Sequence, residues 1–240
     1  MKILITGVVG FIGYSLSNEL LRNKKNFVIG IDNFSTYSGK DIKKLRLKLL
    51  KKKRNFKFFK IDIKKKNQIC NLIKKNSFDI IVHLAAEVGV RYSIIRPDKY
   101  IDSNIFGFFN LIESLKFNQP KKLLFASSSS VYGDSKIFPL KESQNLNPIN
   151  VYALSKKNNE EIAKIYSKKY NTKFIGLRFF TVFGELGRPD MFFFKLLYNA
   201  FKNKKLYLNN SGNHYRDFTY IKDVTHILQR LMNVRLLNNY

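Results

Sequence analysis

A glycine-rich turn near the amino terminus constrains the fold of this chain more than any other stretch. The short apolar run KILIT (Lys2–Thr6) is typical of a buried strand, and TGVVGFIG follows it at once, with glycines at positions 7, 10 and 13. Helical spacing of apolar residues then continues to position 23. Such a turn brings backbone close to a pyrophosphate, which the helix N-terminus stabilises through N–H groups and its dipole. We therefore expect a nucleotide-phosphate site. Glycines that serve only a tight turn are the alternative.

Strand and helix patterns alternate along the chain. Unalternated apolar runs predict strands at residues 2–6, 27–32, 56–62, 78–86, 121–129 and 172–179, and helical spacing predicts helices at 11–23, 68–75, 97–117 and 151–170. This order is typical of a parallel sheet covered by helices on both faces. We therefore expect an α/β fold, a Rossmann-like doubly wound parallel sheet. The nucleotide-binding Rossmann domain should cover residues 1–180. A small, interleaved part of a substrate-binding lobe should follow at 181–240.

The net charge of +27 raises the question of a polyanionic partner. Lysine is spread along the whole chain, which favours solvated faces over specific nucleic-acid binding. The densest basic stretch, residues 43–57, predicts a solvated amphipathic helix or, as the alternative, an anion contact. Cys70 is the single cysteine, so no intrachain disulfide can form, and no Cys/His cluster indicates a metal. Without a leader-like start or a bilayer-length apolar run, we expect a cytoplasmic protein with no membrane contact.

The end of the second predicted strand indicates which dinucleotide binds. Asp32 lies 19 positions beyond the last glycine of the turn, where a carboxylate accepts hydrogen bonds from the adenosine ribose. The residues NFST that follow contain no arginine for a 2′-phosphate, so NAD is favoured over NADP. Asp62 and Ile63 end the third strand, where an adenine ring would lie.

A tyrosine and a lysine stand four residues apart in NVYALSKKNNEE. On a helix, Tyr152 and Lys156 lie one above the other on the same face. A proton carrier beside a fixed positive charge is one way to build a general base. In a chain with 44 lysines and arginines, chance spacing is the alternative.

Several motifs appear in a fixed order: TGVVGFIG, GIDNFS, KIDI, HLAAEVGVRYS, SNIFG, ASSSSVYG, YALSK, RFFTVFGELGRPDMFFF and YRDFTYIKDV. Together they resemble the extended short-chain dehydrogenase/reductase family, and within it the nucleotide-sugar epimerases. The stretches AEVGVRYS, RFFTVFGELGRPDM and YRDFTYIKDV are most similar to the subgroup of UDP-glucuronate 4-epimerases. The resemblance covers essentially the whole chain.

The resemblance implies a catalytic set. Tyr152 would be the general base, Lys156 its partner, and Ser128 the third member. The ordinary pKa of tyrosine, about 10, is too high for a base near neutral pH. The lysine ammonium and the positive charge of nicotinamide would both lower it. The implied NAD contacts are Gly7, Gly10, Phe11, Ile12, Gly13, Asp32, Asn33, Asp62, Ile63, Leu84, Ala85, Ala86, Asn104, Tyr152, Lys156 and Phe179.

The resemblance also implies how a substrate is held. Related dehydratases carry an Asp-Glu pair where Ser129 and Ser130 stand, and a serine cannot do that acid–base work, so dehydration is disfavoured. These hydroxyls and that of Thr181 could hydrogen-bond a sugar carboxylate. Arg216 matches the family's pyrophosphate-binding arginine. The implied substrate contacts are Arg91, Ser128, Ser129, Ser130, Thr181, Arg188 and Arg216.

The implied reaction is inversion at C4 of a UDP-sugar, most closely UDP-glucuronate to UDP-galacturonate, by hydride transfer through a 4-keto sugar. An epimerase of neutral UDP-sugars and an inactive nucleotide-binding protein are the alternatives, because family members normally continue well past residue 240. The resemblance also implies a homodimer, formed through the helical segments at 97–117 and 151–170. Glu87 departs from the glutamine usual in the subgroup, and a negative charge there should weaken binding of an anionic substrate.

Overall fold

The fold is described from a computed structural model, which describes residues 1–35, 39–213 and 215–234. Its centre is a six-stranded sheet in the order β3-β2-β1-β4-β5-β6, and every neighbouring pair is parallel. The central strand β1 hydrogen-bonds on both sides, with Ile3 opposite Val28 on one side and Ile80 on the other. The strands are β1 (Lys2–Thr6), β2 (Phe27–Asp32), β3 (Phe56–Lys60), β4 (Ile80–His83), β5 (Lys122–Ser128) and β6 (Lys173–Phe179). This order is that of a doubly wound dinucleotide-binding sheet, so the predicted fold class is confirmed.

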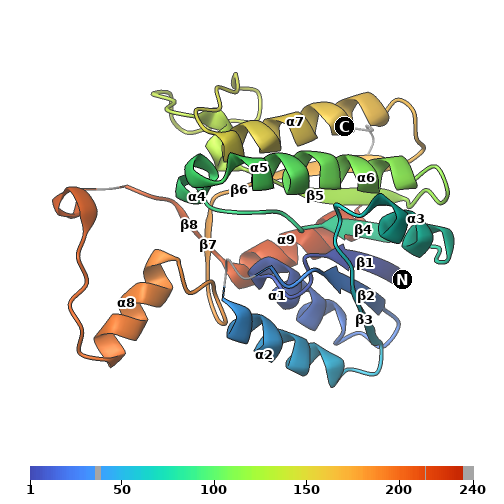
Figure 1. Ribbon diagram of the computed structural model, residues 1–240, viewed down its shortest axis with the longest axis horizontal. Coiled ribbons are helices and arrows are strands. Elements are labelled where there is room, and N and C mark those ends of the chain that lie inside the picture. Colours follow the sequence, from blue (N-terminus) through green and yellow to red (C-terminus); the bar gives the residue numbers. More distant parts are fainter. Residues whose placement is uncertain (36–38, 214, 235–240) are drawn as a thin grey trace.

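Helices cover both faces of the sheet, as Figure 1 shows. On one face, α1 (Phe11–Leu20), α2 (Lys40–Lys51) and α9 (Ile221–Asn233) pack over a core that includes Leu16, Val224 and Leu228. On the other, α3 (Lys66–Lys74), α6 (Gly107–Ser114) and α7 (Val151–Tyr166) pack over a second core. Consecutive residues of β1 are fully buried because both of its faces are covered, which explains the unalternated apolar run.

The segment expected to be one helix at 97–117 is broken into several. It contains α5 (Pro97–Tyr100), a π-helical stretch η1 (Ile101–Phe106) and then α6; the short helix α4 (Val90–Ile95) precedes it. A π-helical stretch inserts an extra residue per turn and is frequent at functional sites. Here it carries the buried Asn104. Its amide oxygen accepts the N–H of Glu87, and its amide nitrogen donates to the Glu87 carbonyl. The irregularity thus follows from a tertiary contact that helical periodicity does not reveal.

After β6 the chain leaves the sheet and then returns to it. The strands β7 (Thr181–Phe183) and β8 (Phe218–Tyr220) pair with each other, and α8 (Phe192–Phe201) projects away from the sheet in Figure 1. Helix α9 returns to the body of the fold, and Lys122 Nζ donates to the carbonyls of Leu231 and Met232 at its end. The domain division at residue 180 remains a prediction. Among the described residues, none of the helices combines the length and apolar character that crossing a bilayer demands.

Candidate active site

The turn after β1 forms one wall of the site. Gly7 adopts a positive φ of 68°, and its carbonyl accepts the N–H of Gly10 at 2.9 Å. A Cβ added to Gly13 would lie 2.3 Å from that same carbonyl, so only glycine allows α1 to approach the turn this closely. The N-terminus of α1 has no side-chain cap and no acidic residue in its first turn. Its N–H groups and positive dipole are therefore free for an anion.

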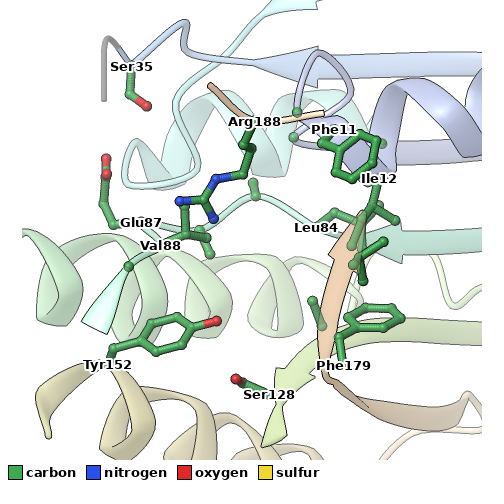
Figure 2. Close-up of a pocket in the computed structure, with 18 of the residues that line it drawn as sticks. Phe11, Ile12, Ser35, Leu84, Glu87, Val88, Ser128, Tyr152, Phe179 and Arg188 are labelled. Carbon is green, nitrogen blue, oxygen red and sulfur yellow. The ribbon is translucent and has the colours of Figure 1, made fainter. Parts of the chain in front are cut away.

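A cavity of about 650 Å³ lies at the carboxyl ends of the strands, beside this turn (Figure 2). It gathers residues from the turn, from the ends of β2, β4 and β5, from the first turns of α7, and from the segment after β6. Most of the predicted site residues line it: Gly7, Gly10, Phe11, Ile12, Gly13, Asp32, Asn33, Ile63, Leu84, Ala85, Ala86, Arg91, Ser128, Ser129, Ser130, Tyr152, Lys156, Phe179, Thr181 and Arg188.

Asp32 lies at one end of the cavity with a lysine beside it. Its Oδ1 accepts the N–H of Phe34 at 2.8 Å, and Lys43 Nζ lies 4.0 Å from the same oxygen. Burial raises the pKa of the Asp32 carboxyl, while Lys43 acts in the opposite direction. Lys43 also donates to the Ser35 carbonyl at 2.8 Å, so it fixes the segment that follows β2.

The sequence suggested that the cations of helix α2 are solvated, but the structure shows this for only some of them. Lys44 and Lys48 are exposed, but Lys43 and Arg46 turn inward and are buried. Arg46 donates to the carbonyls of Val9 and Gly187 at 2.9 and 3.1 Å. It thereby connects the glycine turn to the loop that carries Arg188. Burial lowers the Arg46 pKa to about 10, so the guanidinium stays charged near neutral pH.

The tyrosine and lysine occupy the start of α7. Asn150 caps this helix by accepting the N–H of Ala153 at 2.9 Å, which places Tyr152 in the first turn. Lys156 is 1% exposed, its Nζ donates to the Ala126 carbonyl at 2.8 Å, and it lies 6.0 Å from the centre of the Tyr152 ring. Figure 2 shows the Tyr152 ring and the Ser128 side chain on the same side of the cavity.

The electrostatics of this pair differ from the expectation. Burial raises the pKa of Tyr152; the interaction with Ser128 and the positive charge of Arg188 act in the opposite direction. Burial also lowers the pKa of Lys156 to about 8. The surrounding protein groups therefore favour the protonated phenol, because both side chains are removed from water. A lowered Tyr152 pKa depends on a further positive charge, which nicotinamide would supply.

The four serines of the β5 end have different environments. Ser127 Oγ donates to Glu160 and is buried. Ser128 Oγ accepts the N–H of Ser130 at 3.2 Å and caps the short 3-10 helix η2 (Ser129–Tyr132). Among the described residues, the Ser129 and Thr181 hydroxyls make no hydrogen bond within the protein. They are therefore open to a ligand in the cavity.

Three predicted site residues do not line the cavity. Asp62 lies beside it, where its Oδ2 accepts from Asn33 Nδ2 at 3.3 Å. Asn104 lies behind the wall and bonds Glu87 and Ser155. The third is Arg216, whose contact with the substrate stays a prediction. The residue is exposed, on the extended segment before β8, and its Nη1 donates to the neighbouring Tyr215 carbonyl.

Sequence reasoning missed several residues that line the cavity, among them the charged residues Lys43, Asp190 and Lys195. Lys43 stands one turn before the apolar face of α2, and that spacing was the signal that it could turn inward. Asp190 holds Arg188 through two hydrogen bonds, at 3.0 and 2.5 Å, and so aims its guanidinium. Figure 2 shows the Arg188 side chain extending across the cavity, between the glycine turn and Tyr152.

The doubly wound sheet, the uncapped glycine turn and the tyrosine–lysine pair in one cavity define a dinucleotide-dependent enzyme of the Rossmann type. The chain belongs to the NAD dependent epimerase/dehydratase family, whose sequence profile matches residues 3–236.

Individual relatives agree with this assignment. Protein CapI of Staphylococcus aureus is 42% identical over 97% of this chain and 69% of its own length. UDP-glucuronate 4-epimerase 4 of Arabidopsis thaliana is 41% identical over 93% of this chain and 52% of its own length. A crystal structure of UDP-glucuronic acid 4-epimerase from Bacillus cereus, in complex with UDP-glucuronic acid and NAD, superposes with a TM-score of 0.92 at 33% identity. The superposition covers 98% of this chain and 74% of the Bacillus cereus chain.

The residues of the cavity fit NAD. The uncapped start of α1 offers N–H donors to a pyrophosphate, and the Asp32 carboxylate stands where a ribose diol would donate. The Lys43 ammonium, 4.0 Å from Asp32, would offer a second contact for ribose hydroxyls. The family is NAD-dependent, in agreement with the cofactor expected from the sequence.

Glu87→Gln should strengthen NAD binding at alkaline pH. Burial raises the pKa of the Glu87 carboxyl; Lys43, Lys99 and Lys64 oppose that shift, and Asp62 adds to it. Above its pKa the carboxylate repels a pyrophosphate, so the NAD affinity of the unchanged protein should fall as pH rises through that pKa. The variant should lack this fall, bind about three- to tenfold tighter on the alkaline side, and match the unchanged protein at acid pH.

Calorimetric titration with NAD across a pH series measures this effect. Asp41→Asn is the control, because Asp41 is a nearly fully exposed carboxylate on α2. The same alkaline gain in both variants would contradict a specific role for Glu87.

Proposed function

We propose that this protein inverts the configuration at C4 of a UDP-sugar with NAD, and that UDP-glucuronate is its substrate. The observation that carries the proposal is the composition of one cavity. The glycine turn, the Tyr152–Lys156 pair, and a cluster of hydroxyls with Arg188 all line it. Relatives with 33% and 41% identity are named UDP-glucuronate 4-epimerases.

Each group in the site has its own role in the proposed reaction. Bound in this cavity, NAD would supply the redox chemistry at C4, a reversible hydride transfer through a 4-keto sugar. Tyr152 removes the proton from the C4 hydroxyl and gives it back. Lys156 holds a positive charge one helical turn away, and Ser128 hydrogen-bonds the reacting oxygen. These roles, and those of the other predicted contacts, belong to the proposal.

A uronate is favoured over a neutral sugar by the chemistry of the substrate end. Ser129 and Thr181 offer unused hydroxyls, and Arg188 offers a cation held by Asp190. Hydroxyl donors with a nearby guanidinium stabilise a carboxylate. The Ser129–Ser130 pair contains no carboxyl group for elimination of water, so dehydration stays disfavoured.

The direct experiment incubates the purified protein with NAD and UDP-glucuronate and separates the sugar nucleotides by chromatography. Formation of UDP-galacturonate supports the proposal. Turnover of UDP-glucose or UDP-N-acetylglucosamine in its place would favour an epimerase of neutral sugars. Bound NAD with no turnover of any UDP-sugar would contradict an epimerase and favour a nucleotide-binding role.

Thr181→Val should weaken binding of the uronate selectively. The substitution removes a hydroxyl and keeps the β-branched shape that suits strand β7. Loss of one hydrogen bond to a charged group costs about 1.5–3 kcal/mol, so KM for UDP-glucuronate should rise about ten- to a hundredfold. Binding of UDP-glucose, measured by displacement, should change little. Thr219→Val, on the paired strand β8 and outside the cavity, is the matched control. Equal losses for both sugars would remove the argument from the carboxylate.

A homodimer and a cytoplasmic location complete the proposal. Around α6 and α7, apolar side chains are solvent-exposed: Phe106 is 56% exposed and Ile165 66%. Phe109 and Leu154 lie on the same two helical segments and are also partly exposed. Pairing of these helices with a second copy would bury this surface. The family resemblance supports the same arrangement.

A further inference from the structure

An ion pair between buried Glu160 and half-buried Arg178 lies next to the wall of the cavity that carries the serines. Glu160, on α7, is 5% exposed, and Arg178, on β6, donates to it twice, from Nε to Oε1 at 3.0 Å and from Nη2 to Oε2 at 2.8 Å. Neither side chain lines the cavity. A bidentate arginine–carboxylate pair is directional, and a buried carboxylate left unpaired is strongly destabilising. The pair therefore sets the position of α7 against β6 without touching a ligand.

Ser127 connects this pair to the catalytic wall. Its buried hydroxyl donates to Glu160 Oε1, and Ser128 is the next residue of β5. Lys156, one turn earlier on α7, makes a second link through its hydrogen bond to the Ala126 carbonyl. Residues four apart lie on one face of a helix. Two consecutive turns of α7 are thus bonded to two consecutive residues of β5, immediately before Ser128.

Arg178 extends the same network to the substrate end of the cavity. Its Nη1 donates to the Tyr132 hydroxyl at 2.9 Å and to the Glu142 carbonyl at 3.0 Å. Tyr132 ends the short helix η2, which carries Ser129 and Ser130. The guanidinium therefore holds together the helix of the general base, the strand end of Ser128 and the turn of the two serines.

We propose that Glu160 and Arg178 are positioning residues of the tyrosine–lysine–serine site, an inference that rests on the proposed epimerase function. Glu160 holds the end of β5 through Ser127, at the level where Ser128 meets Tyr152. Arg178 orients Glu160 and neutralises it. This neutralisation matters for the site. An unpaired carboxylate on this face of α7 would stabilise the Lys156 ammonium and disfavour ionisation of Tyr152 to its phenolate.

Two single substitutions then have opposite electrostatic effects. Arg178→Met leaves the Glu160 charge unbalanced, which should raise the pKa of Tyr152 and move the acidic limb of kcat/KM to higher pH. Glu160→Gln leaves the guanidinium unbalanced and should move that limb to lower pH. Each shift should be about half a pH unit or more, because Glu160 is buried and lies one helical turn from Lys156, where solvent screens charges weakly. The double variant removes both charges and should return the limb to its original pH.

The experiment measures the pH dependence of kcat and KM with NAD and UDP-glucuronate for these three variants and for Ser127→Ala. The alanine variant breaks the link without changing the charge, so it should lower kcat, leave KM nearly unchanged and not shift the limb. Glu113→Gln is the matched control: Glu113 is a carboxylate outside the cavity that accepts from Tyr166, the last residue of α7. It should show no shift.

A purely structural pair would give a different result. The single variants would then lose stability and kcat together, with no shift of the limb or with shifts of the same sign, and that result overturns the inference. If the unchanged protein shows no epimerase activity, that result instead counts against the proposed function. In that case the tyrosinate absorbance of NAD-bound protein, minus that of the matching Tyr152→Phe variant, reports the Tyr152 pKa without turnover. Opposite shifts in that titration would still support the inference, and their absence would reject it.

Discussion

Tyr152→Phe should lower kcat for C4 epimerisation by about a hundred- to ten-thousandfold, the range that a positioned general acid–base contributes. The substitution removes only the phenol oxygen. The ring should keep its edge-to-face contact with Tyr100, whose ring centre lies 6.1 Å away, so the wall of the cavity should not collapse. Turnover by chromatography of the sugar nucleotides, together with NAD retained after gel filtration, measures the effect.

A second tyrosine of the same helix provides the control for that experiment. Tyr166→Phe removes a hydroxyl that donates to Glu113, outside the cavity, and should leave kcat within about twofold of the unchanged protein. NAD should remain bound in both variants, because the phenol is one of many contacts in the cavity. Tyr152→Phe with full activity would show that another group carries the proton.

Gly13→Ala should strongly weaken productive cofactor binding. The new Cβ would lie 2.3 Å from the Gly7 carbonyl and 3.0 Å from the Val8 Cα, both of which are backbone atoms that cannot rotate away. Helix α1 or the turn must therefore move by about 1 Å, a displacement that can cost about a hundredfold in kcat/KM. Retained NAD and kcat/KM measure the loss, and thermal unfolding shows whether the fold survives.

Ser15→Ala is the matched control for the glycine, because it also places alanine in α1. It removes only the hydrogen bond from Ser15 Oγ to the Phe11 carbonyl within the helix. Kinetics and NAD content should stay close to those of the unchanged protein. If Gly13→Ala behaves as this control does, the close approach of α1 to the turn is unnecessary for the cofactor.

Local patterns were sufficient for the central features of the fold and the site. The glycine turn, the unalternated strands and the amphipathic helices depend on neighbours within about one helical turn or a few strand residues, so periodicity predicts them. Tyr152 and Lys156 meet on one face of α7 for the same reason. Asp32 ends β2 as expected, because the carboxyl end of a parallel strand is where a dinucleotide fold presents its polar groups.

Other features depend on residues that are far apart in the chain. Glu160 reaches Ser127 across 33 positions, and Arg46 reaches Gly187 across 141. Composition predicted that the cations of α2 are solvated, yet Lys43 and Arg46 are buried because carbonyls outside the helix accept their hydrogen bonds. Likewise, no local signal separates Ser127, which bonds Glu160, from Ser129, whose hydroxyl makes no hydrogen bond to a described residue.

The same distinction applies to predicted site residues that do not line the cavity. Arg216 lies in a motif that predicts a pyrophosphate contact, and this contact stays a prediction, since the side chain is exposed outside the cavity. The Asn104 amide hydrogen-bonds the Glu87 backbone behind the cavity wall, because the π-helical stretch orients it toward Glu87. Chain-local periodicity determines which elements form. Which polar group meets which partner depends on how those elements pack, since a buried donor or acceptor must find a partner wherever the fold places one.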